Sequence, residues 1–322
     1  MEHSALFGTT AFPPLAENAI VLTGPTASGK SSVAISIAEH INAEIVSIDS
    51  IAVYQGMDIG TAKPSATDRV RVPHHLLDVV SPTEEFSVAN YLTRATHCSN
   101  EIIARGKRPL FVGGTPMYLK GLLYGFDPGP PADWEFRRAV EADIAAYGIE
   151  ALHKRLQQVD PLSAHKLPAT DTRRITRALE VAYLTGVPIS HRQTQHEHLN
   201  ANRTPTLIAL SWPRETLHQR IQQRVESMFQ VGLVGEVQSL LDQHQALSRT
   251  AATAVGYREV IAHLCNDIPI NETKQRVLFH TRQLARRQET WFRSLPTLQS
   301  IEVTSEQSLV TATEQIVKQV SQ

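Results

Sequence analysis

The octapeptide Gly24-Pro-Thr-Ala-Ser-Gly-Lys-Ser31 matches G-x-x-x-x-G-K-[ST], the pattern of the phosphate-binding P-loop. The apolar run Ala19 to Leu22 before it predicts a short buried strand, and the apolar spacing over residues 32–41 after it predicts a helix. This order points backbone N–H groups and a helix N-terminus at one place, where a diphosphate or triphosphate would bind. The predicted phosphate-binding residues are Gly24, Thr26, Ala27, Ser28, Gly29, Lys30 and Ser31, and the Ser31 hydroxyl is the predicted Mg²⁺ ligand.

Alternating strands and helices around the motif predict an α/β fold in which a parallel sheet is flanked by helices. Further strands are expected at 44–48, 109–112 and 206–210, with a helix at 86–105. In such sheets ligands gather beyond the carboxyl ends of the strands. The P-loop, Asp49 and Thr115 all follow strand ends, so we expect them to share one cleft.

A change in composition after Tyr124 predicts a second, all-helical domain inserted in the first. Asp127-Pro-Gly-Pro-Pro131 breaks the α/β pattern, and helices are expected at 136–146, 150–158 and 172–185. We therefore assign 126–203 to the helical insertion, and 1–125 with 204–322 to the P-loop core. In the core, helices are expected from Pro213 and at 272–293, followed by a weakly patterned tail after Ser300.

Composition places few limits on partners, because the 322 residues carry a formal net charge of only -1. Cys98 and Cys265 are the two cysteines and make no disulfide framework, which indicates a reducing compartment. Residues 1–12 lack the features of a signal peptide, and no apolar run approaches the ~20 residues that cross a bilayer. We expect a cytoplasmic protein without a membrane partner.

Two residues at strand ends are candidates for the chemistry. Asp49 ends an otherwise apolar strand, so its carboxylate is expected to face the cleft and act as a general base, or to be a helix cap or Mg²⁺ ligand. After the third strand stands Gly113-Gly114-Thr115, where a P-loop NTPase would carry an acidic residue for Mg²⁺. That substitution disfavours an ATPase. The Thr115 hydroxyl can hydrogen-bond a reacting oxygen, although a plain tight turn explains the glycines equally.

Arg224 lies within the apolar stripe of the helix that follows Pro213, beside Leu217 and Met228. A guanidinium directed inward needs an anionic partner. Either a structural carboxylate or a diphosphate held by the P-loop fits the pattern.

Two groups of arginines indicate a nucleic-acid substrate. Arg282, Arg286 and Arg293 fall within roughly 40° on one face of the last long helix, and Arg173, Arg174 and Arg177 form a second group. Such faces are often merely solvated, but a phosphate backbone needs them.

Together these residues resemble the tRNA dimethylallyltransferases, also called tRNA isopentenyltransferases or the IPP transferase family. Gly56-Met-Asp-Ile-Gly-Thr-Ala-Lys-Pro64 is the most specific match. The other matching segments follow in order over nearly the whole chain: the P-loop, Asp49-Ser50, Val53-Tyr54, Pro73 to Leu76, Gly113 to Thr115 with Tyr118, Arg174 to Glu180, Val255 to Tyr257, and Thr281 to Gln288.

The resemblance implies transfer of the dimethylallyl group from dimethylallyl diphosphate to N6 of the adenosine 3′-adjacent to the anticodon, in tRNAs reading codons that begin with U. It implies Mg²⁺ as cofactor, a tRNA anticodon arm as partner and a monomer. The implied catalytic residues are Asp49, Thr115 and Arg224. The implied tRNA-binding residues are Asp49, Ser50, Ile51, Ala52, Arg137, Arg173, Arg174, Arg177, Gly256, Tyr257, Arg258, Arg282, Arg286, Arg287 and Arg293.

Three alternatives remain from the residues alone. An adenylate isopentenyltransferase would use the same donor with free AMP, but it needs neither the insertion nor the arginine helix. A small-molecule kinase would bind ATP at the P-loop, but the acidic residue for Mg²⁺ that such an enzyme carries after the third strand (the Walker B acid) is missing. A tRNA-binding module without activity would not need Lys30, Asp49 and Thr115 together.

Overall fold

The computed structural model describes residue 12, residues 19–192 and residues 205–321. The predicted end of the insertion near residue 203, and most of the segment examined for a signal peptide, lie outside these residues. The chain divides into two compact units, one made of Leu15–Leu123 with Thr204–Gln322 and the other of Met1–Pro14 with Tyr124–Arg203.

The larger unit is built on one six-stranded sheet whose paired strands all run parallel, in the order β3-β2-β4-β1-β5-β6. Its strands are β1 (Ile20–Thr23), β2 (Ala43–Ile48), β3 (His74–His75), β4 (Arg108–Gly113), β5 (Thr206–Ser211) and β6 (Gln299–Glu302). The four predicted strands are confirmed to within one residue at each end, and the predicted α/β class is confirmed. β3 and β6 were not predicted, because β3 has only two residues and β6 has one apolar residue among its four.

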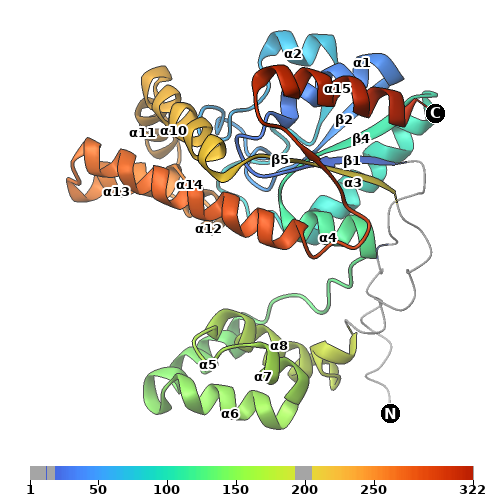
Figure 1. Cartoon of the computed structure of the whole chain (residues 1–322). Coiled ribbons are helices and arrows are strands. Elements are labelled where there is room, and N and C mark those ends of the chain that lie inside the picture. The colour runs from blue at the N-terminus through green and yellow to red at the C-terminus, as the bar shows by residue number, and fades with distance from the viewer. Residues whose placement is uncertain (1–11, 13–18, 193–204, 322) are drawn as a thin grey trace. The chain divides into compact units, whose positions relative to one another are not determined.

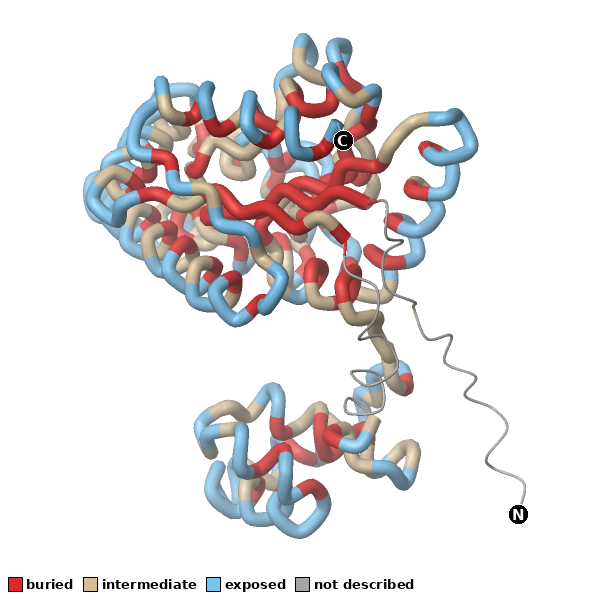
Figure 2. Tube along the Cα trace, turned by 45° about the vertical axis from the view of Figure 1, so that its right-hand side comes forward, coloured by how far each residue is buried: buried red, intermediate tan, exposed pale blue. Residues whose placement is uncertain are grey.

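Helices cover both faces of this sheet, so the central strands are buried on both sides and consist of apolar runs (Figures 1 and 2). Ile20 of β1 lies opposite Leu110 of β4 and Thr206 of β5. The helices of this unit are α1 (Lys30–Ile41), α2 (Ala66–Arg71), α3 (Val88–Ala104), α4 (Pro116–Tyr124), α10 (Arg214–Val231), α11 (Leu233–Gln243), α12 (Arg249–Ala252), α13 (Tyr257–Asn266), α14 (Ile270–Phe292) and α15 (Glu306–Val320).

The expectation of a weakly patterned tail after Ser300 was wrong. α15 packs on α1 and buries Leu309, Ala312, Ile316 and Val320, whose spacing of three and four residues marks one face of a helix. Its Leu309 side chain would lie 2.9 Å from a Cβ added at Gly29. The α15 helix therefore packs against the P-loop at Gly29.

The described residues of the smaller unit form the helices α5 (Trp134–Tyr147), α6 (Ile149–Val159), α7 (Pro161–Lys166) and α8 (Thr172–Thr185), and residues 189–192 are also helical. Three of them were predicted, and α7 was missed because six residues show little periodicity. The unit has its own core, formed by Val140, Leu152, Leu156, Ala164, Ile175, Ala178 and Leu179.

Glu180 is a buried carboxylate of this unit, with an exposure of 0%, as is Asp160. Arg137 donates to it from α5 at 2.8 and 2.9 Å, and the Asp133 backbone N–H donates at 2.8 Å. Arg177 donates to it at 2.5 Å and also holds the carbonyls of Pro128 and Pro130. Burial raises the pKa of Glu180, but these bonds outweigh burial and leave the pKa below its usual value.

Replacing Glu180 with alanine is expected to destabilise the helical unit by about 3 kcal/mol, because two partly buried arginines and one N–H lose their partner. Hydrogen exchange of the α8 amides measures this free energy of local unfolding. The exposed Glu150 provides the control, and Glu150→Ala should cost less than about 0.5 kcal/mol. A similar small cost for Glu180→Ala would contradict a structural role for this cluster.

Within the described part of the chain, no helix is long and apolar enough to cross a membrane.

Candidate functional site

The phosphate loop of residues 24–31 joins β1 to α1 and depends on two glycines. Gly24 has φ +143°, and a Cβ there would meet the Leu210 carbonyl oxygen at 2.7 Å. Gly29 has φ +88° and immediately precedes α1, which begins at Lys30. Both positions favour glycine because L side chains rarely adopt such angles. The first turn of α1 is thereby aimed into the site.

Lys30 is folded back on its own loop in this structure. Its Nζ donates to the carbonyls of Gly24 at 2.8 Å and Pro25 at 2.7 Å. Burial and, to a lesser extent, the nearby charge of Arg224 together lower the pKa of Lys30 to about 7, against the opposing effect of Asp49. An anion arriving at the loop would restore the ammonium form.

Two cavities meet at this loop. The outer one, about 650 Å³, is lined by the loop, α1, Arg220 and Arg224. The inner one, about 150 Å³, is lined by Lys30, Ser31, Asp49, Gly113, Gly114, Arg224 and Gln288. We expected the P-loop, Asp49 and Thr115 to share one cleft. Lys30, Ser31 and Asp49 do line the inner cavity, but Gly113 and Gly114 line it in place of Thr115.

Asp49 directly follows β2, and its carboxylate is held by the turn that it begins. Oδ1 accepts hydrogen bonds from the backbone N–H groups of Ile51 at 2.8 Å and Ala52 at 3.1 Å. The carboxylate thus caps a turn, as one alternative expected, and also lines the inner cavity. Among the described residues no hydrogen bond reaches its second oxygen, which leaves that oxygen for a group that enters.

Thr115 contacts Ser50 instead of lining the inner cavity. Its Oγ1 accepts from the Ser50 N–H at 3.1 Å and lies 3.5 Å from the Ser50 hydroxyl. The Thr115 hydroxyl therefore fixes the turn next to Asp49.

Arg224 points inward from α10, as its place in the apolar stripe predicted. Among the described residues no carboxylate forms an ion pair with it, and its Nη2 donates to the Thr61 carbonyl at 3.2 Å. Burial lowers the pKa of Arg224, and the charge of Asp49 opposes that effect. Of the two partners expected for Arg224, the arrangement favours a bound anion over a structural carboxylate.

The segment 58–64 forms the wall that faces Arg224, and Glu236 of α11 holds it in place. The Glu236 carboxylate accepts from the N–H groups of Asp58 at 2.9 Å and Ile59 at 2.7 Å, and from the Tyr257 hydroxyl at 2.7 Å. Tyr257 was expected to contact tRNA, but it is fully buried. Its ring packs against Gly60, where a Cβ would lie 2.4 Å away, so its role here is to position this wall.

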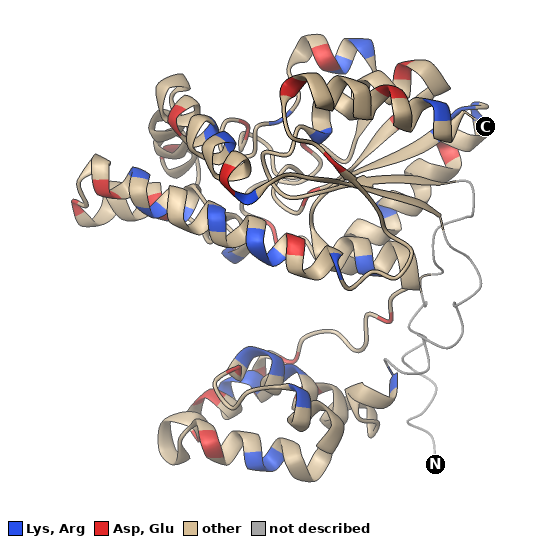
Figure 3. Cartoon of the chain, in the orientation of Figure 1, with Lys and Arg blue, Asp and Glu red and all other residues tan. Residues whose placement is uncertain are grey.

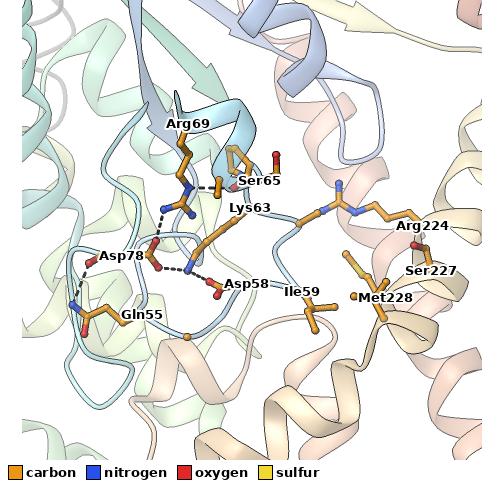
Figure 4. A pocket seen from close by; sticks show the side chains of 15 residues that line it. Gln55, Asp58, Ile59, Lys63, Ser65, Arg69, Asp78, Arg224, Ser227 and Met228 are labelled. Atoms are coloured by element: carbon orange, nitrogen blue, oxygen red, sulfur yellow. Dashed lines mark hydrogen bonds and ion pairs between the residues drawn. The ribbon is translucent and has the colours of Figure 1, made fainter. Parts of the chain in front are cut away.

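A third cavity, about 780 Å³, opens on the other side of the same wall (Figure 4). Lys63, with 2% of its side chain exposed, lies between the carboxylates of Asp58 at 2.7 Å and Asp78 at 2.5 Å. Arg69 also donates to Asp78 at 2.8 Å. This charge network is internally paired and explains why the motif carries Asp58 and Lys63 together.

The predicted arginines divide into structural and exposed groups. Arg137 and Arg177 hold Glu180, Arg174 pairs with Asp171, and Arg258 pairs with Glu259. Arg173 of α8, Arg286 and Arg287 of α14, and Arg293 at the C-terminal cap of α14 are exposed. Figure 3 shows Lys and Arg repeated along α14. Arg282 is half-buried, and its Nε has no hydrogen-bond partner among the described residues.

Sequence reasoning missed Gln288 and Glu236. Gln288 is 7% exposed and lines the inner cavity. A signal was present, because Gln288 interrupts the buried row of α14 as Arg224 interrupts that of α10. The sequence around Glu236 does not reveal its role, since nothing in α11 indicates that Glu236 binds the segment 58–64.

No group of three His, Cys, Asp or Glu that could hold a metal ion occurs in the described part of the chain. His74 and His75 are hydrogen-bonded to the Val72 carbonyl and to Glu44. Ser31 nevertheless offers a hydroxyl at the P-loop, and Mg²⁺ is commonly held by few protein oxygens together with substrate phosphates.

Comparisons with known proteins agree with this geometry. The model of the IPP transferase family matches residues 52–295, and that of the isopentenyl transferases matches residues 17–73. A tRNA dimethylallyltransferase of Rhodopirellula baltica is 54% identical over 298 residues, 90% of this chain and 89% of the relative. One of Geobacter sulfurreducens is 44% identical over 283 residues, 88% of this chain and 91% of the relative.

Solved structures show the same fold. The tRNA isopentenylpyrophosphate transferase of Bacillus halodurans has a TM-score of 0.68 at 34% identity, covering 94% of this chain and 97% of its own. A eukaryotic dimethylallyltransferase acting on tRNA has a TM-score of 0.78 at 26% identity, covering 92% of this chain and 77% of its own. With its family match, its identities and its fold in agreement, the chain belongs to the IPP transferase family.

Proposed function

We propose that this enzyme transfers the dimethylallyl group of dimethylallyl diphosphate to N6 of the adenosine 3′-adjacent to the anticodon, in tRNAs reading codons that begin with U. The observation that carries the proposal is the inner cavity, which brings Lys30 and Arg224 together with Asp49. A phosphate site and a base therefore face the same small space, as transfer between a diphosphate and an amine requires.

In the reaction a bond forms between N6 and the allylic carbon, while the bond from that carbon to the diphosphate oxygen breaks. Lys30, the loop amides and Arg224 stabilise the charge on the departing diphosphate. Asp49 accepts the proton that N6 loses. Thr115 positions Asp49 through Ser50.

Ser31 is the proposed protein ligand of Mg²⁺, since its hydroxyl lines both cavities. When bound with the diphosphate, the ion adds positive charge where negative charge develops on the leaving group.

The proposed contacts to the tRNA anticodon arm are exposed arginines: Arg286 and Arg287 of α14, Arg293 at its C-terminal cap, and Arg173 of α8. The target base must leave the anticodon stack to reach the inner cavity. A tRNA substrate favours action in the cytoplasm, and an inner cavity lined by residues of one chain favours a monomer.

One assay separates the candidate functions. Dimethylallyl diphosphate labelled in its prenyl group is incubated with the enzyme and either tRNA, AMP or neither. We expect label in tRNA alone. Label in AMP but not in tRNA would identify an adenylate isopentenyltransferase, and phosphate transfer from ATP would identify a kinase.

Binding of pyrophosphate is expected to take up about one proton at pH 8. Lys30 has a pKa of about 7 in the free site, so at pH 8 it is mostly neutral, and the bound anion favours its ammonium form. Affinity should therefore fall as pH rises above 7, by up to about tenfold per unit. Titration calorimetry in buffers of different ionisation enthalpy measures the uptake.

Lys30→Arg provides the control, because arginine stays protonated and leaves only the ionisation of pyrophosphate itself. Equal proton uptake by the wild type and Lys30→Arg would show that Lys30 is already charged in the free enzyme.

A further inference from the structure

Gln288 occupies an unusual place on α14. The buried row of this helix contains Val277, Thr281, Ala285, Gln288 and Phe292. A glutamine needs partners for a carbonyl and an amide when it is withdrawn from water. Gln288 finds both in loops outside its helix.

Its side-chain amide joins two loops of the active site. Oε1 accepts from the Thr26 N–H of the phosphate loop at 2.9 Å, and Nε2 donates to the Gly114 carbonyl at 2.8 Å. The Thr26 N–H is therefore directed at Gln288 in this structure, not at the phosphate site predicted for Thr26. Gly114 directly precedes Thr115, whose hydroxyl positions the turn after Asp49.

The contacts of Gln288 with the phosphate loop and with Gly114 are tightly packed. A Cβ added to Gly114 would lie 2.6 Å from Gln288 Nε2 and 3.2 Å from the Gly24 carbonyl oxygen. The backbones of the phosphate loop and of the Gly114 loop thus both pack against the side-chain amide of Gln288 on α14. A shift of one loop must break a buried hydrogen bond or move the other loop with it.

The opposite side of α14 is exposed and carries Arg286 and Arg287, and the exposed Arg293 directly follows the helix. If tRNA binds there, as the proposed function requires, the helix that receives the RNA is also the helix whose buried amide holds the phosphate loop. The two substrates then act on one element from two sides.

We propose that Gln288 is a positioning residue that couples the binding of the diphosphate to the binding of tRNA. The inference rests on the proposed function, and adds that each ligand raises the affinity for the other. By linkage the factor is the same in both directions.

The test measures the dissociation constant of tRNA with and without saturating inorganic pyrophosphate, for the wild type and Gln288→Leu. We expect pyrophosphate to tighten tRNA binding about fivefold in the wild type and less than twofold in Gln288→Leu. Because the readout is a ratio, a general loss of affinity does not imitate the effect.

Gln275→Leu is the matched control, since Gln275 is an exposed residue of the same helix and should keep the wild-type ratio. If circular dichroism shows that Gln288→Leu does not fold, Gly114→Ala replaces it, because its added Cβ displaces the Gln288 amide from the other side. An unchanged ratio in the variant, or no coupling in the wild type, overturns the proposal. A wild-type chain that fails to bind one of the two ligands contradicts the proposed function itself, and this inference with it.

Discussion

Asparagine in place of Asp49 is expected to slow prenyl transfer by about 100-fold or more, as measured in a single turnover with enzyme in excess over tRNA. The asparagine side-chain carbonyl can still accept from the Ile51 and Ala52 N–H groups, so the turn after β2 keeps its shape. What is lost is the basic oxygen that faces the inner cavity. The affinity for tRNA should stay within about threefold of the wild type.

Asp242→Asn is a suitable control, because Asp242 is exposed on α11 and should leave the rate unchanged. Single-turnover chemistry in Asp49→Asn at the wild-type rate would remove Asp49 as the proton acceptor. A matching loss of tRNA affinity would instead assign the carboxylate to binding.

The parts of the site that follow strand ends were open to prediction, because their position depends on local pattern and one rule about parallel sheets. The P-loop and Asp49 are of this kind, whereas Thr115, predicted by the same rule, does not line the inner cavity. Arg224 was open to prediction for another reason, since a charge inside an apolar helical stripe has to meet an anion.

Contacts between distant segments were not accessible in this way. Nothing near Gln288 in the sequence indicates that its amide joins Thr26 to Gly114, and nothing near Glu236 indicates the wall at 58–64. The sequence also does not show which arginines are exposed and which hold a buried carboxylate. Arg173 and Arg177 lie one helical turn apart, yet only the fold shows that Arg177 holds buried Glu180 while Arg173 is exposed.

Replacing Arg224 with glutamine is expected to lower kcat/KM for dimethylallyl diphosphate by about 100- to 1,000-fold at saturating tRNA. The guanidinium lies between the two cavities, and no carboxylate among the described residues neutralises it. A buried positive charge of this kind stabilises the site most when the departing diphosphate supplies the negative charge. Arg214→Gln, at the exposed start of the same helix, should stay within threefold of the wild type.

The same variant carries a second readout that a merely damaged site would not give. The charge of Arg224 is one cause of the low pKa of Lys30, so its removal should raise that pKa. At pH 8 more of the free enzyme would then hold the Lys30 proton, and pyrophosphate binding would take up less than the roughly one proton expected for the wild type. A kcat/KM within threefold of the wild type, together with unchanged proton uptake, would show that Arg224 neither contacts the diphosphate nor lowers the pKa of Lys30. A fall in kcat/KM with unchanged proton uptake would support the contact of Arg224 with the diphosphate. It would also identify burial as the only cause of the low Lys30 pKa.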